Sequence, residues 1–118
     1  MSYAIKIDVS NDLVVSHKIN WNDENDLDVI QKSLNVVSAD VQSLTSSIDA
    51  WVDDIGALKK GNYLIGLNIA GNEYKLAGKV LLLGLDEDTG KTRGLNEKEI
   101  QWINQNIQLW RKPVGHIN

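Results

Sequence analysis

One run of apolar residues constrains the fold of this chain more than any other sequence feature. Between residues 27 and 58, apolar side chains recur at alternating steps of three and four, and the register never slips. This spacing is typical of an amphipathic or coiled-coil helix. It predicts a long heptad-patterned helix over residues 26–60 with one continuous apolar seam. The seam consists of Leu27, Ile30, Leu34, Val37, Val41, Leu44, Ile48, Trp51, Ile55 and Leu58.

Such a helix would be too long for the rest of the chain to cover. A continuous helix over residues 27–58 would measure about 48 Å. A compact domain of 118 residues has a diameter of only about 35 Å. The exposed part of the seam would then need a partner, most simply a second copy of the chain. We therefore expect a homo-oligomer joined by a coiled coil, and Leu27, Ile30 and Leu34 at its a and d positions favour more than two strands.

A broken helix is the alternative interpretation of the same seam. Thr45-Ser46-Ser47 lies near its middle, and these residue types are poor helix formers but good N-caps. Two shorter helices could then pack on a sheet without any oligomer. The positions beside the seam also lack the alternating Glu and Lys of many dimeric zippers. Both interpretations stay open at this point.

The segments on either side of the seam have the features of β-hairpins. Residues 3–21 alternate apolar and polar around a turn at Asn11-Asp12, and Tyr3, Ile5, Ile7 and Val9 share one face. Residues 62–86 predict a second hairpin with a tight turn near Gly71. The run VLLLGL at residues 80–85 is continuously apolar, which indicates a strand covered on both faces.

A C-terminal helix is predicted over residues 96–111, because Asn96 and Glu99 form a variant of the capping box. The chain is thus predicted to be a single α+β domain over residues 1–118, in the order ββαββα. The C-terminal helix carries two apolar stripes, whereas a surface helix needs one. The second stripe indicates either burial between two neighbours or a second contact site, whose candidates are Trp102, Leu109 and Trp110.

Composition excludes several classes of chemistry. The chain has no cysteine and only two histidines, so a disulfide framework, a thiolate zinc site and a cysteine nucleophile are ruled out. Its formal net charge of −4 argues against nucleic-acid binding. No apolar run is long enough for a transmembrane helix, so no membrane contact is expected.

Two motifs with a superficial chemical signature fail, one on spacing and the other on residue type. Around Gly90-Lys91-Thr92, Gly84 and Gly90 enclose five residues, whereas the two glycines of a phosphate loop must enclose four. As a calcium loop, the same segment has Lys91 where glycine is required. His17 falls on the apolar face of its strand, which predicts a histidine in the core or at its rim. We expect no catalytic residue, no cofactor and no metal site.

These features predict a non-enzymatic structural or protein–protein interaction module that self-associates through its long helix. A heptad helix joined to small β elements is common in larger assemblies, including phage tails and baseplates, although this is an analogy of fold only. The alternative is a small acidic monomeric inhibitor or immunity-type protein that binds and blocks another protein. The N-terminus lacks the apolar core of a secretory signal, which favours a cytoplasmic or virion-associated protein.

Overall fold

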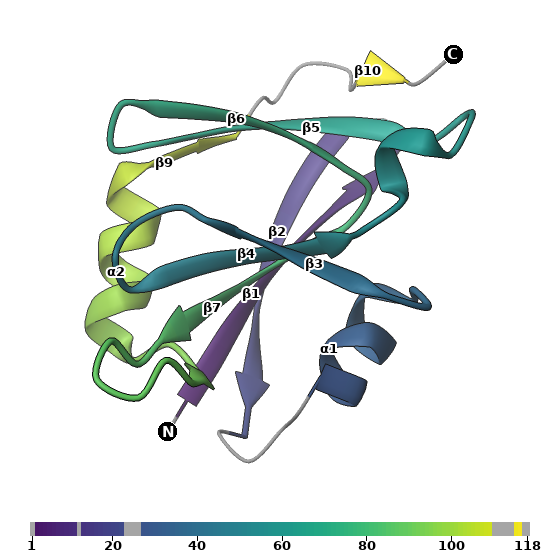
Figure 1. The fold of residues 1–118 in the computed structure, drawn as a ribbon. Coiled ribbons are helices and arrows are strands. Elements are labelled where there is room, and N and C mark those ends of the chain that lie inside the picture. Colours follow the sequence, from purple (N-terminus) through teal and green to yellow (C-terminus); the bar gives the residue numbers. More distant parts are fainter. Residues whose placement is uncertain (1, 12, 23–26, 110–114, 117–118) are drawn as a thin grey trace.

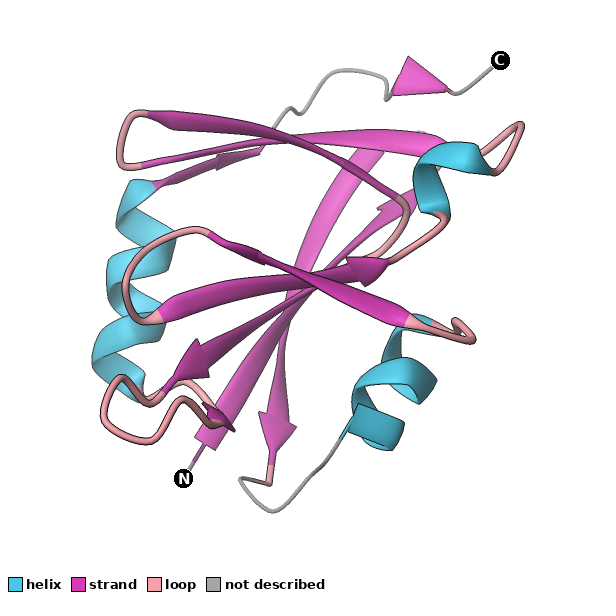
Figure 2. Cartoon of the chain, in the orientation of Figure 1, coloured by secondary structure: helices cyan, strands magenta, loops and turns pink. Residues whose placement is uncertain are grey.

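The computed structural model describes residues 2–11, 13–22, 27–109 and 115–116, and antiparallel sheets dominate them (Figures 1 and 2). The larger sheet, sheet A, has the strand order β2-β1-β7-β4-β3. Its edge strands are β2 (Leu13–Trp21) and β3 (Ala39–Ser43), and between them lie β1 (Ser2–Ser10), β7 (Val80–Leu85) and β4 (Ile48–Asp53). The short strand β8 (Thr92–Arg93) pairs with the end of β7.

The smaller sheet, sheet B, is built around β5 (Tyr63–Ile69). One side of β5 pairs with β6 (Asn72–Ala77). Its other side pairs with two short strands near the C-terminus, β9 (Ile107–Leu109) and β10 (Gly115–His116). Segments that are far apart in sequence therefore share one sheet.

Sheet A separates two hydrophobic cores. One core lies between sheet A, sheet B and α2 (Glu97–Asn106), whose Ile100 and Ile103 are buried there. The other core lies on the opposite face, under α1 (Leu27–Leu34). The run VLLLGL forms β7, and it supplies both cores: Leu82 contributes to the first and Leu83 to the second. The prediction that this strand is covered on both faces is confirmed.

The first hairpin follows the alternation in the sequence. β1 pairs with β2 from Ser2 opposite Trp21 to Ser10 opposite Leu13, and Asn11 in the turn has a φ of 51°. Asparagine tolerates this left-handed conformation, which is why it suits a two-residue hairpin turn. Tyr3, Ile5, Ile7 and Val9 share one face, as predicted, and this face packs in the core between the two sheets.

The long helix predicted over residues 26–60 is wrong, because α1 ends at Leu34. Asn35 adopts a left-handed conformation with a φ of 56°. Its N–H donates to the Lys32 carbonyl at 3.1 Å, and the Val36 N–H donates to the Gln31 carbonyl at 3.0 Å. These two bonds are the Schellman arrangement that closes a helix end. Asparagine is one of the few residues other than glycine that fits its left-handed position.

Val37 lies between α1 and β3, and the rest of the seam lies in the β3–β4 hairpin and at the 3-10 helix η1 (Gly56–Leu58), so the coiled coil and the order ββαββα are also wrong. The chain does turn at Thr45-Ser46-Ser47, but it turns between β3 and β4 rather than between two helices. Within β4, Ile48 packs in the core between the sheets and Trp51 packs toward α1. Because neighbouring strand residues face opposite sides, a separation of three places these two side chains on opposite faces. A strand covered on both faces can therefore imitate the spacing of a helix.

Two smaller differences concern the later elements. The segment 62–86 holds the β5–β6 hairpin with its turn at Ala70-Gly71, but β7 leaves this hairpin and joins sheet A. Gly78, with a φ of 84°, lies at the change of sheet. The C-terminal helix begins after Asn96 as predicted, but it ends at Asn106, because residues 107–109 pair with β5 instead.

Candidate functional site

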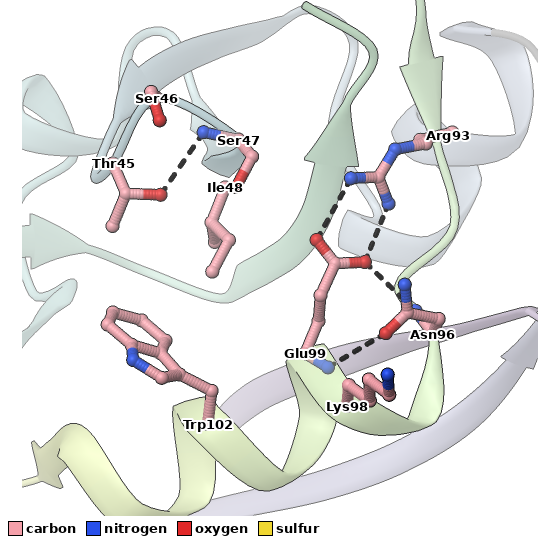
Figure 3. Close-up of a pocket in the computed structure, with 9 residues that line it drawn as sticks. All are labelled: Thr45, Ser46, Ser47, Ile48, Arg93, Asn96, Lys98, Glu99 and Trp102. Atoms are coloured by element: carbon pink, nitrogen blue, oxygen red, sulfur yellow. Dashed lines mark hydrogen bonds and ion pairs between the residues drawn. The ribbon is translucent and has the colours of Figure 1, made fainter.

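A surface groove with a volume of about 560 Å³ lies between the β3–β4 turn and the exposed side of α2 (Figure 3). The turn forms one wall, α2 forms the other, and the end of β8 closes one side. The lining residues are Thr45, Ser46, Ser47, Ile48, Arg93, Asn96, Lys98, Glu99 and Trp102.

The start of α2 is fixed by a capping box. The Glu99 N–H donates to the Asn96 side chain at 2.9 Å, and the Asn96 N–H donates to the Glu99 carboxylate at 3.1 Å. These bonds satisfy two backbone donors that the helix itself leaves unpaired. The same carboxylate faces the groove, so capping and the shape of the groove depend on one side chain.

A two-pronged ion pair joins β8 to α2 along the groove. Arg93 donates to the two carboxylate oxygens of Glu99 at 2.7 and 2.9 Å, the geometry of a strong arginine–carboxylate pair. Burial tends to raise the pKa of Glu99, but the hydrogen bonds from Arg93 and from the Asn96 N–H outweigh it and hold that pKa below its usual value. Glu99 is therefore a fixed, ionised anchor of the groove.

Gly84 makes room for this ion pair. It lies opposite Arg93 in the β7–β8 pairing, and a Cβ atom at this position would come within 2.5 Å of the Arg93 Nη1. Real Cβ atoms do not approach another heavy atom so closely, so only glycine leaves the guanidinium in place. The glycine inside the buried run VLLLGL is explained by this close approach.

The opposite wall is a turn held by its own hydroxyl groups. The Thr45 hydroxyl accepts the Ser47 N–H at 3.2 Å, and the Ser43 hydroxyl donates to the Thr45 carbonyl at 3.0 Å. The Ser47 carbonyl accepts the Leu85 N–H at 2.9 Å, which ties the turn to β7. The turn is thus preorganised, and it leaves Ser46 exposed at its tip.

Trp102 supplies the apolar surface of the groove. Its side chain is 37% exposed, whereas Ile48 beneath the turn is 3% exposed. Figure 3 shows the indole on the side of the groove opposite the turn. Because Arg93 is engaged with Glu99, the charge at the rim that is most open to solvent is the exposed Lys98. The groove therefore combines one aromatic surface, one cation and several hydroxyl groups.

The structure scatters the ten seam residues over several elements. Ile30, Leu34, Leu44 and Ile48 are buried within the chain's own cores, and Trp51 is half-buried. The other five are exposed but do not lie on one helix: Leu27 is in α1, Val37 follows it, Val41 is in β3, and Ile55 and Leu58 are at η1.

Of the three residues predicted to form a second contact, Trp102 lines the groove. Leu109 lies in β9 opposite Leu67, and Trp110 lies outside the described residues. No sequence pattern predicted that Arg93 and the turn at residues 45–47 line a groove, or that Gly84 makes room there. The signal for Gly84 was a lone glycine in a buried strand, which often marks a close approach of other atoms.

The other residues considered for chemistry lie apart from the groove. The loop after β7 is a hairpin turn in which the Asp86 carboxylate accepts the N–H groups of Asp88 and Thr89 at 3.0 and 3.3 Å. His17, expected in the core or at its rim, has an exposed side chain on β2. His116 lies in β10. The part of the chain that is described holds no group of three or more His, Cys, Asp or Glu residues suited to a metal ion.

Comparisons with known proteins give no match for this chain: no family model, no curated protein and no solved structure is similar to it. Among the described residues, no helix is long and apolar enough to cross a membrane.

Proposed function

We propose that this protein is a non-enzymatic protein–protein interaction module that holds an extended segment of a partner polypeptide in the groove between the β3–β4 turn and α2. The observation that carries the proposal is Trp102, a large aromatic side chain left 37% exposed beside a preorganised groove. Aromatic residues with an apolar face and a polar edge are typical anchors of protein interfaces.

The chemistry of the rim indicates which segment would fit. Lys98 is exposed, and the Arg93–Glu99 pair leaves it as the most exposed cation of the lining. A partner segment with one apolar side chain for Trp102 and one carboxylate for Lys98 would complement both groups. The hydroxyl groups of the turn at residues 45–47 would hydrogen-bond the backbone of such a segment.

The interaction role expected from the sequence is retained, but the binding surface is the groove and not a long helix. This proposal also accommodates the alternative of a small monomeric inhibitor, because blocking another protein requires such a contact surface. A module of this kind would act in the cytoplasm or as part of a virus particle, the two locations that the sequence favours.

A display library of short random peptides tests the proposal, because the identity of the partner need not be known for the selection. The wild-type protein and the control Gln101→Ala, altered at an exposed position of α2 outside the groove, should enrich apolar peptides with an acidic residue. Trp102→Ala should lose at least about tenfold in affinity for the enriched peptides, the effect expected of an interface anchor.

The charge reversal Lys98→Glu gives a sharper result. With this variant, the enriched peptides should carry a basic residue in place of the acidic one. They should keep their apolar residue, because Trp102 is unchanged. Enrichment that is equal in the wild type and in Trp102→Ala, or absent in both, would show that the groove is not a peptide site.

A further inference from the structure

The two edges of sheet A differ in how their backbone groups are used. On β3, the Val41 N–H donates to the carboxylate of its neighbour Asp40 at 2.8 Å. The Gln42 side chain donates to the Ser43 carbonyl at 3.2 Å. These short-range bonds occupy backbone groups that would otherwise pair with another strand, which is one way in which proteins blunt an edge.

The outer edge of β2 is open by comparison. Tyr3 in β1 exchanges two backbone hydrogen bonds with Leu95, at 2.9 and 2.7 Å, so it cannot also exchange them with Asn20, its partner in β2. Hydrogen-bonded and non-hydrogen-bonded pairs alternate along an antiparallel ladder. The odd-numbered residues of β2 therefore bond to β1, and the even-numbered residues direct their N–H and C=O groups outward. The outward residues are Val14, Ser16, Lys18 and Asn20.

Within the described residues, no strand pairs with this outer edge. The edge is nine residues long, whereas β3 has five. Long unpaired edges are templates for strand addition. The occupant of such an edge can be deduced from the side chains that the edge would bring together.

We infer that β2 is the self-association site of this protein, where it pairs antiparallel with β2 of a second copy around a two-fold axis at His17. In this register Val15 lies opposite Ile19 of the second copy, and Leu13 lies opposite its Trp21. All of these apolar residues are odd-numbered and share one face of sheet A. Leu13, which is 47% exposed in the single chain, gains an apolar neighbour.

The direction of the backbone hydrogen-bonding groups agrees with the same axis. Ser16 lies opposite Lys18 of the second copy and Val14 lies opposite its Asn20, so all outward residues face outward residues. An axis at Lys18 would place two ammonium groups directly opposite each other, which is unfavourable. An axis at Ser16 would leave Asn20 and Trp21 beyond the paired segment. The axis at His17 pairs all nine residues of β2 and opposes no two lysines.

This interface is separate from the groove and does not depend on the peptide-binding proposal. Both copies would contribute sheet A to one continuous sheet, with the blunted β3 edges at its two ends. Further strand addition would then stop at the dimer. The seam residues expected to drive self-association play no part in it.

Sedimentation equilibrium over about 5–500 µM protein tests the inference, because a dimer forms by mass action. The mass of the wild type should approach twice the 13.1 kDa of a single chain as the concentration rises. Ser16→Pro removes an outward N–H that no strand of the described chain uses. Proline is tolerated on edge strands in this position, so the variant should remain folded by circular dichroism and become monomeric.

His17→Glu is the second variant, and Asn72→Glu is its matched control. The introduced carboxylate would lie beside Lys6, the neighbour of His17 in β1, so the single chain keeps a favourable pair. Across the two-fold axis, however, it would face a second carboxylate. We expect the dissociation constant of the dimer to rise about tenfold or more. Asn72 is exposed in β6 of the other sheet, so the same added charge there should leave the dimer unchanged.

Two results would overturn the inference: a wild type that stays monomeric at the highest concentration, or a folded Ser16→Pro or His17→Glu variant that remains as dimeric as the wild type. Trp102→Ala should leave the mass unchanged, which separates this interface from the groove.

Discussion

Asp49 allows a sharp test of the packing around sheet A. Its side chain is 6% exposed in β4, between Leu83 of β7 and Ser43 of β3. In the part of the chain that is described, no hydrogen bond or ion pair compensates its carboxylate. Burial raises the pKa of this carboxyl, because a low-dielectric environment disfavours the charged form. The substitution Asp49→Asn removes the charge and keeps the shape, so it measures the cost of that charge.

The expected gain in stability follows from the burial. Burying an uncompensated polar group costs about 1–3 kcal/mol in proteins. An asparagine amide would still lack a partner at this site, so Asp49→Asn removes only the extra cost of burying a charged group rather than a neutral one. Because Asp49 still has some contact with solvent, we expect the variant to gain about 1 kcal/mol at pH 7. Unfolding entropy near 2.1 cal/mol/K per residue converts 1 kcal/mol into about 4 °C for a chain of this size.

The pH dependence has a definite sign. A raised pKa means that the folded state holds the Asp49 proton more tightly than the unfolded state. The penalty is therefore present above the folded pKa, and it disappears as the pH falls below the ordinary aspartate value near about 4. The advantage of Asp49→Asn should shrink toward zero over that interval.

Urea unfolding followed by tryptophan fluorescence, at pH 7 and near pH 3, measures this difference. Asp54→Asn is the control, because it removes the same charge from an exposed position just after β4 and should change stability by less than about 0.5 kcal/mol. The reasoning is refuted if Asp49→Asn is less stable than the wild type at pH 7. It is equally refuted if the gain is the same at both pH values.

Two further predictions concern helix ends. Glu99→Gln should cost about 1–3 kcal/mol at pH 7, because it weakens the charge-assisted pair with Arg93. Since the pKa of Glu99 is lowered, its contribution is present above the ordinary glutamate value and is lost as the pH falls through the folded pKa, so thermal melts of the two proteins should converge progressively as the pH is lowered through that interval. Asn35→Ala should cost about 1 kcal/mol, because Asn35 has a φ of 56°, whereas Asn35→Gly should cost little or nothing. Equal losses for Ala and Gly in urea unfolding would show that the left-handed end of α1 is not the reason for asparagine there.

Local signals in the sequence predicted several elements well. The alternation over residues 3–9 and the turn at Asn11 correspond to β1 and to its hairpin with β2. Asn96 and Glu99 form the capping box that their spacing predicted. In each case the signal comes from residues that are close together in the sequence, so it could be interpreted without knowledge of any distant contact.

The seam failed because its residues serve two cores. A helix would place Ile48 and Trp51 on one face, but in β4 they lie on opposite faces, and both faces are covered. The spacing of apolar residues cannot distinguish one buried helix face from a strand buried on both sides. The decisive local signal was Asn35, whose tolerance of positive φ ends α1 after Leu34.

The groove depends on contacts that no local pattern contains. Its walls come from residues 45–48 and 93–102, which meet only because β4 and β7 are neighbours in sheet A. Trp102 was predicted as a contact residue from the second stripe of the C-terminal helix, but its partner wall could not be deduced. Pairing between strands distant in sequence is set by the packing of whole sheets, not by the propensity of either segment.

The sequence by itself thus determined the first hairpin, the start of α2 and the doubly buried strand β7, since turn chemistry, capping and continuous apolarity act over short distances. Only the tertiary structure decided that the seam is divided among α1, β3, β4 and η1, because burial on both faces of sheet A removes the alternation that identifies a strand. It also decided which backbone N–H and C=O groups of β2 point away from β1, since their direction follows from the pairing of β1 with its neighbours.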